Sequence, residues 1–127
     1  MRRARVVAVS GTSGLVAFQL ALAAGAPWGR LAWGGRHERV LPTELRAASM
    51  ASALVWAGAL VAAATASHSP AVTRARTAYA ILAGVGTVMN AVSPSRPERL
   101  LWTPVAGALA GSLWRLSRER GDVSGSL

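Results

Sequence analysis

The amino-acid sequence predicts an all-α protein: an integral membrane bundle of about four transmembrane helices in a single domain of 127 residues. Hydrophobic residues make up 52% of the chain. The 14 basic and five acidic residues lie at the two ends and in short stretches between long uncharged segments. A soluble helical protein would distribute its charges along the exposed face of each helix. The segregation therefore indicates that hydrocarbon surrounds the uncharged segments.

The first predicted helix covers residues 6–26, which follow a basic start and contain no charge. Its length of 21 residues is enough to span a hydrocarbon core of roughly 30 Å. A secretory signal peptide is the alternative, because Ala24-Gly25-Ala26 resembles a cleavage site. Pro27 would then be the first mature residue, which the peptidase tolerates poorly, and the apolar segment is long for a signal core. We therefore expect a retained helix.

A connecting loop is predicted over residues 27–44 and the second helix over 45–66. Thr43 is expected to be the N-cap of this helix, with Glu44 in its first turn, where a negative charge is favourable. The third helix is predicted over residues 71–92, because Ser69 followed by Pro70 is typical of an N-cap and first helical position.

The third helix has a short uncharged part, which begins only at Thr77. It spans a bilayer comfortably if Arg74 and Arg76 extend their side chains to the headgroup zone. The fourth helix is predicted over 97–117, with a capping box formed by Ser95 and Glu98. A segment that does not cross fully is the alternative for this helix. Residues 121–127 are predicted to be a disordered tail.

Small residues are expected to form the contacts between the helices, because lipid tails are as apolar as leucine and close backbone approach favours association. In the first helix the predicted packing stripe consists of small residues, and the bulky ones are expected to meet lipid. The stripe is Ser10, Ser13, Gly14, Ala17, Ala21 and Ala24, and the bulky face is Leu15, Phe18 and Leu22. In the fourth helix Gly107 and Gly111 form a G-x-x-x-G motif.

The net charge of +9 raises the possibility of nucleic-acid binding, but the arginines flank apolar segments, where they anchor a chain to lipid headgroups. The partner expected is therefore the lipid bilayer, with no nucleic acid. Eight arginines fall on the side of the termini and six on the other side. This difference favours a multi-pass protein of the cell (inner or plasma) membrane with both termini cytoplasmic, and its small size leaves dual insertion open.

The central part of each predicted span lacks an ionisable residue, which counts against proton-coupled transport and intramembrane hydrolysis. We predict no catalytic residue, no cofactor and no metal site, and the chain contains no cysteine. His37 and His68 fall on opposite sides of the membrane. The polar exceptions are Gln19 and Asn90, which are candidates for intramembrane polar contacts. They either line a small polar site or, as we favour, form hydrogen bonds between helices.

The loop over residues 27–44 is unusually rich in tryptophan, glycine and arginine. One interpretation is a surface loop that contacts lipid headgroups through Trp28, Arg30, Trp33, Arg36 and Arg39. The simpler interpretation, which we favour, is a connection that its tryptophans anchor to the membrane surface.

Three sequence strings, GAPWGRLAWGG, LPTELR and MNAVSPSRPERLLWTP, resemble a group of uncharacterised small four-helix membrane proteins of high-GC bacteria. The resemblance covers most of residues 20–105 and implies a membrane fold without a known activity. Small multidrug-resistance transporters have a similar length and four helices, and carry a membrane-embedded glutamate in the first helix. Here Gln19 is the only strongly polar residue of that helix, so the coupling carboxylate is missing.

These observations predict a protein that is not an enzyme and acts as a structural or accessory component of the membrane. Another membrane protein or a second copy of the chain would be its partner. A small oligomeric transporter or channel is the alternative. A lipid-modifying enzyme is the third hypothesis, and it would have to use Glu38, Glu44, Glu98 or His37 at the headgroup level.

Overall fold

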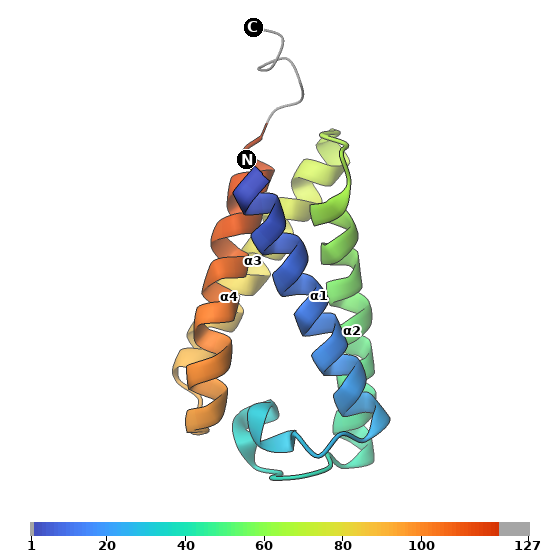
Figure 1. The fold of residues 1–127 in the computed structure, drawn as a ribbon, viewed down its shortest axis with the longest axis vertical. Helices are drawn as coiled ribbons and strands as arrows, with labels where there is room; N and C mark the ends of the chain where they lie inside the picture. Colours follow the sequence, from blue (N-terminus) through green and yellow to red (C-terminus); the bar gives the residue numbers. More distant parts are fainter. Residues whose placement is uncertain (1, 120–127) are drawn as a thin grey trace, which may run out of the picture.

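The computed structural model describes residues 2–119, which form four α-helices and no β-strand (Figure 1). The helices are α1 (Arg2–Ala24), α2 (Thr43–Ala64), α3 (Pro70–Ala91) and α4 (Arg96–Ser117), and two 3₁₀ turns, η1 (Gly29–Leu31) and η2 (Trp33–Gly35), lie between α1 and α2. The prediction of an all-α fold is confirmed. The tail predicted over residues 121–127 lies outside the described residues.

Two of these helices, α1 and α2, are long and apolar enough to cross a bilayer by length and composition, with mean hydropathies of 1.8 and 1.7 over their most apolar windows. Only 17% and 28% of those windows are buried inside the protein. The helices α3 and α4 do not meet the same criterion.

Local side-chain chemistry explains where α3 and α4 begin. The Ser69 hydroxyl accepts a hydrogen bond from the Val72 amide at 3.3 Å, and Pro70 occupies the first helical position, as predicted. The Ser95 hydroxyl accepts from the Glu98 amide at 3.3 Å in the same way. Both hydroxyls satisfy amides that have no partner within the helix.

The predicted N-cap of α2 is wrong by one residue. The helix begins at Thr43 itself, and Pro42 is the residue before it, in an extended conformation and without a side-chain cap. The Pro42 carbonyl accepts from the amides of Leu45 and Arg46, each at 3.0 Å. Proline fixes its own backbone in a conformation that can lead into a helix, so the chain turns here without the Thr43 hydroxyl.

The helices pack in two pairs that diverge. Helix α1 packs along α2, and α3 packs along α4, whereas α2 and α3 make few contacts with each other. The pairs converge at the end that holds the start of α1 and the end of α4, and they separate toward the other end, where the α1–α2 loop lies (Figure 1).

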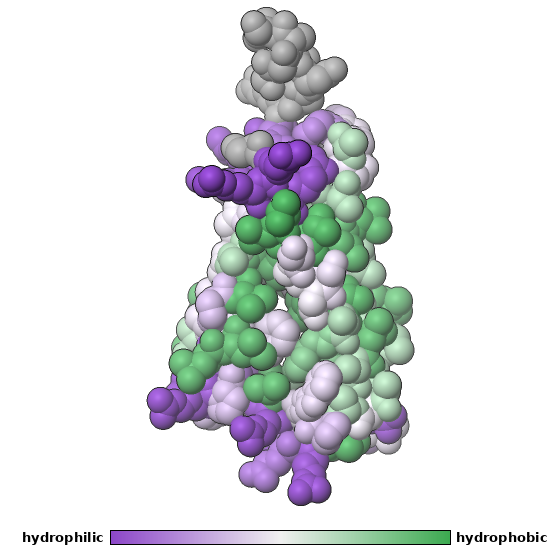
Figure 2. Space-filling view, viewed as in Figure 1, coloured by the Kyte–Doolittle hydropathy of each residue, from purple (hydrophilic) through white to green (hydrophobic). Residues whose placement is uncertain are grey.

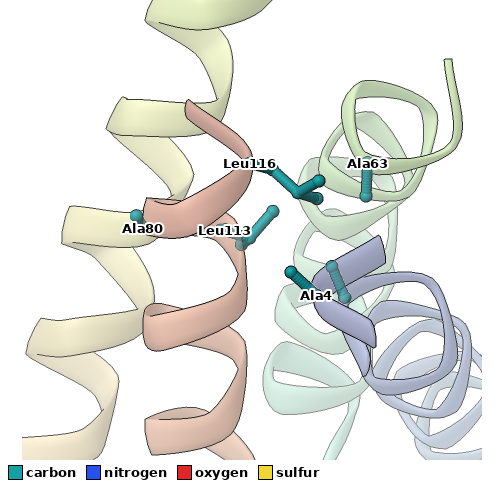
Figure 3. Packing of buried hydrophobic residues seen from close by; sticks show 6 residues of the cluster. Ala4, Ala63, Ala80, Leu113 and Leu116 are labelled. Carbon is teal, nitrogen blue, oxygen red and sulfur yellow. The ribbon is translucent and has the colours of Figure 1, made fainter. Parts of the chain in front are cut away.

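The convergent end contains a small core. Leu113 and Leu116 of α4 are fully buried and point toward the alanines of α1 and α2 (Figure 3). The neighbouring helices contribute only alanines to this cluster of buried residues, namely Ala4, Ala8, Ala63 and Ala80. Small side chains allow the backbones to approach closely, which is the expected contact where burial of apolar area gives no driving force.

The prediction for the faces of α1 is wrong. Ser10, Ser13, Gly14 and Ala17 are exposed, whereas Leu22 is completely buried against Ala32 and Leu41. The divergence of the helix pairs explains the reversal. Only the first half of α1 lies close to α4 (Figure 1), and beyond it Leu22 packs against the loop residues Ala32 and Leu41.

Two guanidinium groups bind the carboxyl end of α2, which carries no basic residue in its own last turn. Arg5 of α1 donates through Nη1 to the carbonyls of Ala63 and Ala64 at 3.2 Å and to Thr65 at 2.7 Å. These carbonyls have no partner within the helix, and the negative, carboxyl end of the helix dipole favours a cation.

Arg76 of α3 is fully buried at the same place, so the prediction that it extends to the headgroup zone is wrong. Its Nε donates to the Ala62 carbonyl at 2.8 Å and its Nη2 to Thr65 at 2.9 Å. Its Nη1 reaches the Leu116 carbonyl of α4 at 3.4 Å and lies 3.5 Å from the His68 ring. One side chain thereby joins α2, α3 and α4.

We expect Arg76→Leu to lower the free energy of unfolding by about 3 kcal/mol, because several buried carbonyls lose a charged donor. Arg5→Leu should lower it by about 1–2 kcal/mol, since this side chain is only partly buried. Unfolding in a mild detergent by heat or by SDS titration would measure both. Arg74→Leu is the matched control, because Arg74 is exposed on the same helix. Equal stability of the Arg74 and Arg76 variants would contradict this interpretation.

Candidate functional site

The α1–α2 loop is folded rather than extended, and its glycines explain how. The Gly29 amide donates to the Arg39 carbonyl at 2.7 Å, and a Cβ atom at position 29 would collide with the backbone oxygens of His37 and Arg39. Gly34 and Gly35 have φ angles of 80° and 73°, which residues with a side chain rarely adopt. The chain therefore folds back on itself at the divergent end of the helices.

Hydrogen bonds attach this loop to both helix pairs. The Trp33 indole donates to the buried Ser49 hydroxyl of α2 at 3.0 Å. Facing it, the Trp102 indole of α4 donates to the Leu31 carbonyl at 2.9 Å, and the Ser95 hydroxyl donates to the Arg30 carbonyl at 2.7 Å. The loop thus bridges the two pairs where they are farthest apart.

Glu98 is part of this bridge, and the predicted capping box is half formed. Its amide is capped by Ser95, but its carboxylate does not return to the Ser95 amide. Instead Oε2 accepts from the Gly34 amide at 3.0 Å and from the Ser93 hydroxyl at 2.9 Å. The carboxylate binds a loop that is 64 residues away in the sequence, so helix-capping rules alone could not assign it this role.

A cavity of about 860 Å³ lies between the helix pairs and above this loop. All four helices contribute to its wall, which is mostly apolar and aromatic, with Phe18 and Trp102 in contact at 4.7 Å between ring centroids. Its polar lining residues are Gln19, Ser52 and Asn90 from the helices, Arg36 and His37 from the loop, and Ser93 and Glu98 next to the loop. This size is typical of sites for small ligands.

Gln19 and Asn90, singled out from the sequence, both line this cavity from opposite helix pairs. They do not form the favoured hydrogen bonds between helices. The Asn90 amide donates to the Gly86 carbonyl of its own helix at 2.7 Å. The Gln19 Oε1 atom is buried, and no donor reaches it from the part of the chain that the structure describes.

The five predicted headgroup-contact residues lie at the divergent end of the bundle. Trp28 and Trp33 are 44% and 41% exposed. Arg30, Arg36 and Arg39 are exposed, and within residues 2–119 their guanidinium groups bind no other side chain or carbonyl. Trp33 has a structural role, because its indole binds the Ser49 hydroxyl.

The two histidines lie at opposite ends of the bundle, His37 beside the cavity and His68 beside Arg76. Across residues 2–119, no group of three or more His, Asp or Glu side chains could hold a metal ion. The Glu98 carboxylate already binds two donors. The cavity lining can therefore form apolar contacts, hydrogen bonds and, through Arg36, a charged contact to an anionic group.

No protein-family model matches the chain, and no curated protein or solved structure is significantly similar to it.

We expect Glu98→Ala to detach the loop, because two hydrogen bonds to a carboxylate are lost. Local opening should rise by about tenfold or more, since each 1.4 kcal/mol is a factor of ten. Limited trypsin digestion, with quantification of cleavage after Arg30, Arg36 and Arg39, would measure this opening. The control is Glu44→Ala, which removes an exposed carboxylate next to the loop. A Glu98 variant that is cleaved no faster than the control would show that the bridge does not hold the loop.

Proposed function

We propose that the chain is a multi-pass integral membrane protein that spans the bilayer with all four helices, has no enzymatic activity and acts as a structural or accessory component of the cell membrane. One observation supports this above all. Most residues buried between the helices are small, and most of the large apolar residues face outward, the reverse of the distribution in a soluble protein.

The buried set is mainly alanine, including Ala8, Ala59, Ala63 and Ala83. The outward set includes large residues on every helix, with exposed fractions from 40% to 68% for most of them. On α3, which lacks the hydropathy of α1 and α2, Ile81 and Val88 are 60% and 64% exposed. An apolar surface on all sides of a bundle is unfavourable in water and favourable in hydrocarbon.

The outer surface also has the layered distribution that a bilayer requires. On the face drawn in Figure 2, an apolar band covers the helices between two hydrophilic ends. The helices have 22 or 23 residues, which corresponds to about 33 Å and matches a hydrocarbon core. On α3 the charges, Arg74 and Arg76, lie in the second turn, and on α4 the charges lie in the first and last turns. The central part of each helix is uncharged, so these helices can span although their mean hydropathy is lower.

Packing of α1 supports a retained helix rather than a cleaved signal peptide. Ala4 and Ala8 belong to the core at the convergent end, and Leu22 is fully buried near the loop. Removal of α1 would expose the residues that pack against it at both ends of the bundle. It would also remove the hydrogen bonds from Arg5 to the end of α2.

The proposed orientation rests on the arginine count in the sequence, where eight fall in the terminal segments and the α2–α3 connection and six in the other two connections. We propose that both termini are cytoplasmic. Trp28, Arg30, Trp33, Arg36 and Arg39 then meet the headgroups of the opposite leaflet. An enzymatic role is not favoured, because the cavity offers no free pair of an acid and a base.

Single-cysteine labelling tests the span assignment cleanly, because the chain has no native cysteine. Leu54→Cys and Ile81→Cys should react poorly with a membrane-impermeant maleimide, because both positions lie in the middle of a span. Glu38→Cys should react in intact cells and Ser67→Cys only after permeabilisation. Release of the wild-type chain by alkaline carbonate would refute membrane insertion, and equal labelling at positions 38 and 67 in intact cells would refute a single orientation.

A small transporter is the second candidate, and the cavity is the observation that favours it. In that case solute flux in proteoliposomes should fall by about tenfold in Gln19→Leu or Asn90→Leu, since each removes a polar contact to the solute. Leu54→Ala, on the outer surface, is the control. An accessory component would instead show no flux and would purify in mild detergent with a stoichiometric membrane partner.

A further inference from the structure

We propose that the cavity between the two helix pairs binds one acyl chain of an anionic lipid that enters sideways from the bilayer, with its headgroup on Arg36 and His37. This inference rests on the proposed membrane location. It names the ligand of a site that the fold itself does not explain.

The shape of the cavity suits a chain. It begins at the loop and reaches Trp56 on α2 and Leu109 on α4, each about 20 Å along its helix from the loop end at 1.5 Å per residue. Leu109 closes the inner end, because it is buried and its side chain lies close to Gly11. Since α2 and α3 make few contacts, the gap between them is the route by which a lipid would enter.

The apolar wall has space that the protein does not fill. Gly86 lines the cavity, and a Cβ atom placed there would have no neighbour within 4 Å. Leu82, Met89 and Val105 also line this wall. Protein interiors are close-packed, so an apolar space of this size inside a membrane calls for a hydrocarbon occupant.

The polar groups of the cavity match the head of a glycerolipid. Gln19 and Ser52 line the cavity, and side chains of both types can form hydrogen bonds to lipid hydroxyls. Arg36 and His37 stand at the loop end of the same cavity. Arg36 binds no residue among 2–119, and a guanidinium group is suited to a phosphate. Arg30 and Arg39 add positive charge to this end. Phosphatidylglycerol, which carries both hydroxyls and a phosphate, is therefore the probe of choice.

The test is native mass spectrometry of the full chain, delipidated in mild detergent and titrated with phosphatidylglycerol or phosphatidylcholine. We expect one phosphatidylglycerol per chain. Gly86→Leu should weaken its binding by about tenfold, because the leucine side chain occupies the space of the lipid chain. Gly84→Leu is the matched control, because that position on the same helix also has no neighbour within 4 Å but does not line the cavity.

A second variant tests the headgroup contact without changing the packing. Arg36→Gln should reduce the preference for phosphatidylglycerol over phosphatidylcholine by about fivefold, since a charged contact is lost. Soluble glycerol phosphate should not displace the lipid, because it lacks the chain. Displacement by glycerol phosphate would show that the ligand is a free phosphate.

Equal binding by the Gly86 and Gly84 variants, or no bound lipid above the non-specific background, would overturn the proposal. Carbonate extraction of the same variants distinguishes failure of the lipid site from failure of the proposed membrane location. A chain that resists extraction but binds no lipid refutes the lipid site alone, whereas a chain that is extracted refutes the membrane location as well.

Discussion

The carboxyl end of α2 is the point on which the rest of the bundle depends. Its last carbonyls are buried or partly buried except at Ala64, and α2 supplies no basic residue in its last turn to bind them. Arg5 and Arg76 arrive from α1 and α3, and Arg76 also reaches α4. The buried Arg76 guanidinium is stable only when its donors form hydrogen bonds, so α2, α3 and α4 must meet at this place. The alanines around Leu113 and Leu116 permit the same close approach.

The cavity is a consequence of this asymmetry. Helices that converge at one end separate at the other unless large side chains fill the space between them. Here the separation is set by the loop, because Trp33 binds α2 while Glu98 and Trp102 bind the loop from α4. A loop that bridges two helix pairs can hold them apart as well as together. The hydrogen bonds of the loop therefore define a cavity that no helix could form alone.

The sequence was sufficient for the all-α class and for the start of α3, because the long uncharged segments and the Ser69-Pro70 cap are local signals. It was not sufficient for Arg76 or for the faces of α1. An arginine next to an apolar segment has the same pattern whether it extends to lipid headgroups or binds carbonyls of another helix. The choice depends on the end of α2, which is separate in sequence. The burial of Leu22 likewise depends on the divergence of the pairs, which helical periodicity does not encode.

The candidate site follows the same division. Gln19 and Asn90 could be found because a polar side chain is rare within an apolar segment, but only the tertiary arrangement brings them to one cavity. The side chain of Gln19 is also uncharged, which bears on the function of the cavity. An amide can lie in hydrocarbon without a counterion, whereas a carboxylate at the same position would demand a cation or a proton. In the proposed membrane location, a cavity with an uncharged amide in its apolar part and arginine at its loop end would therefore bind the polar head of an amphiphile without a charge in the middle of the bilayer. This arrangement favours retention of a ligand over coupling to a proton gradient.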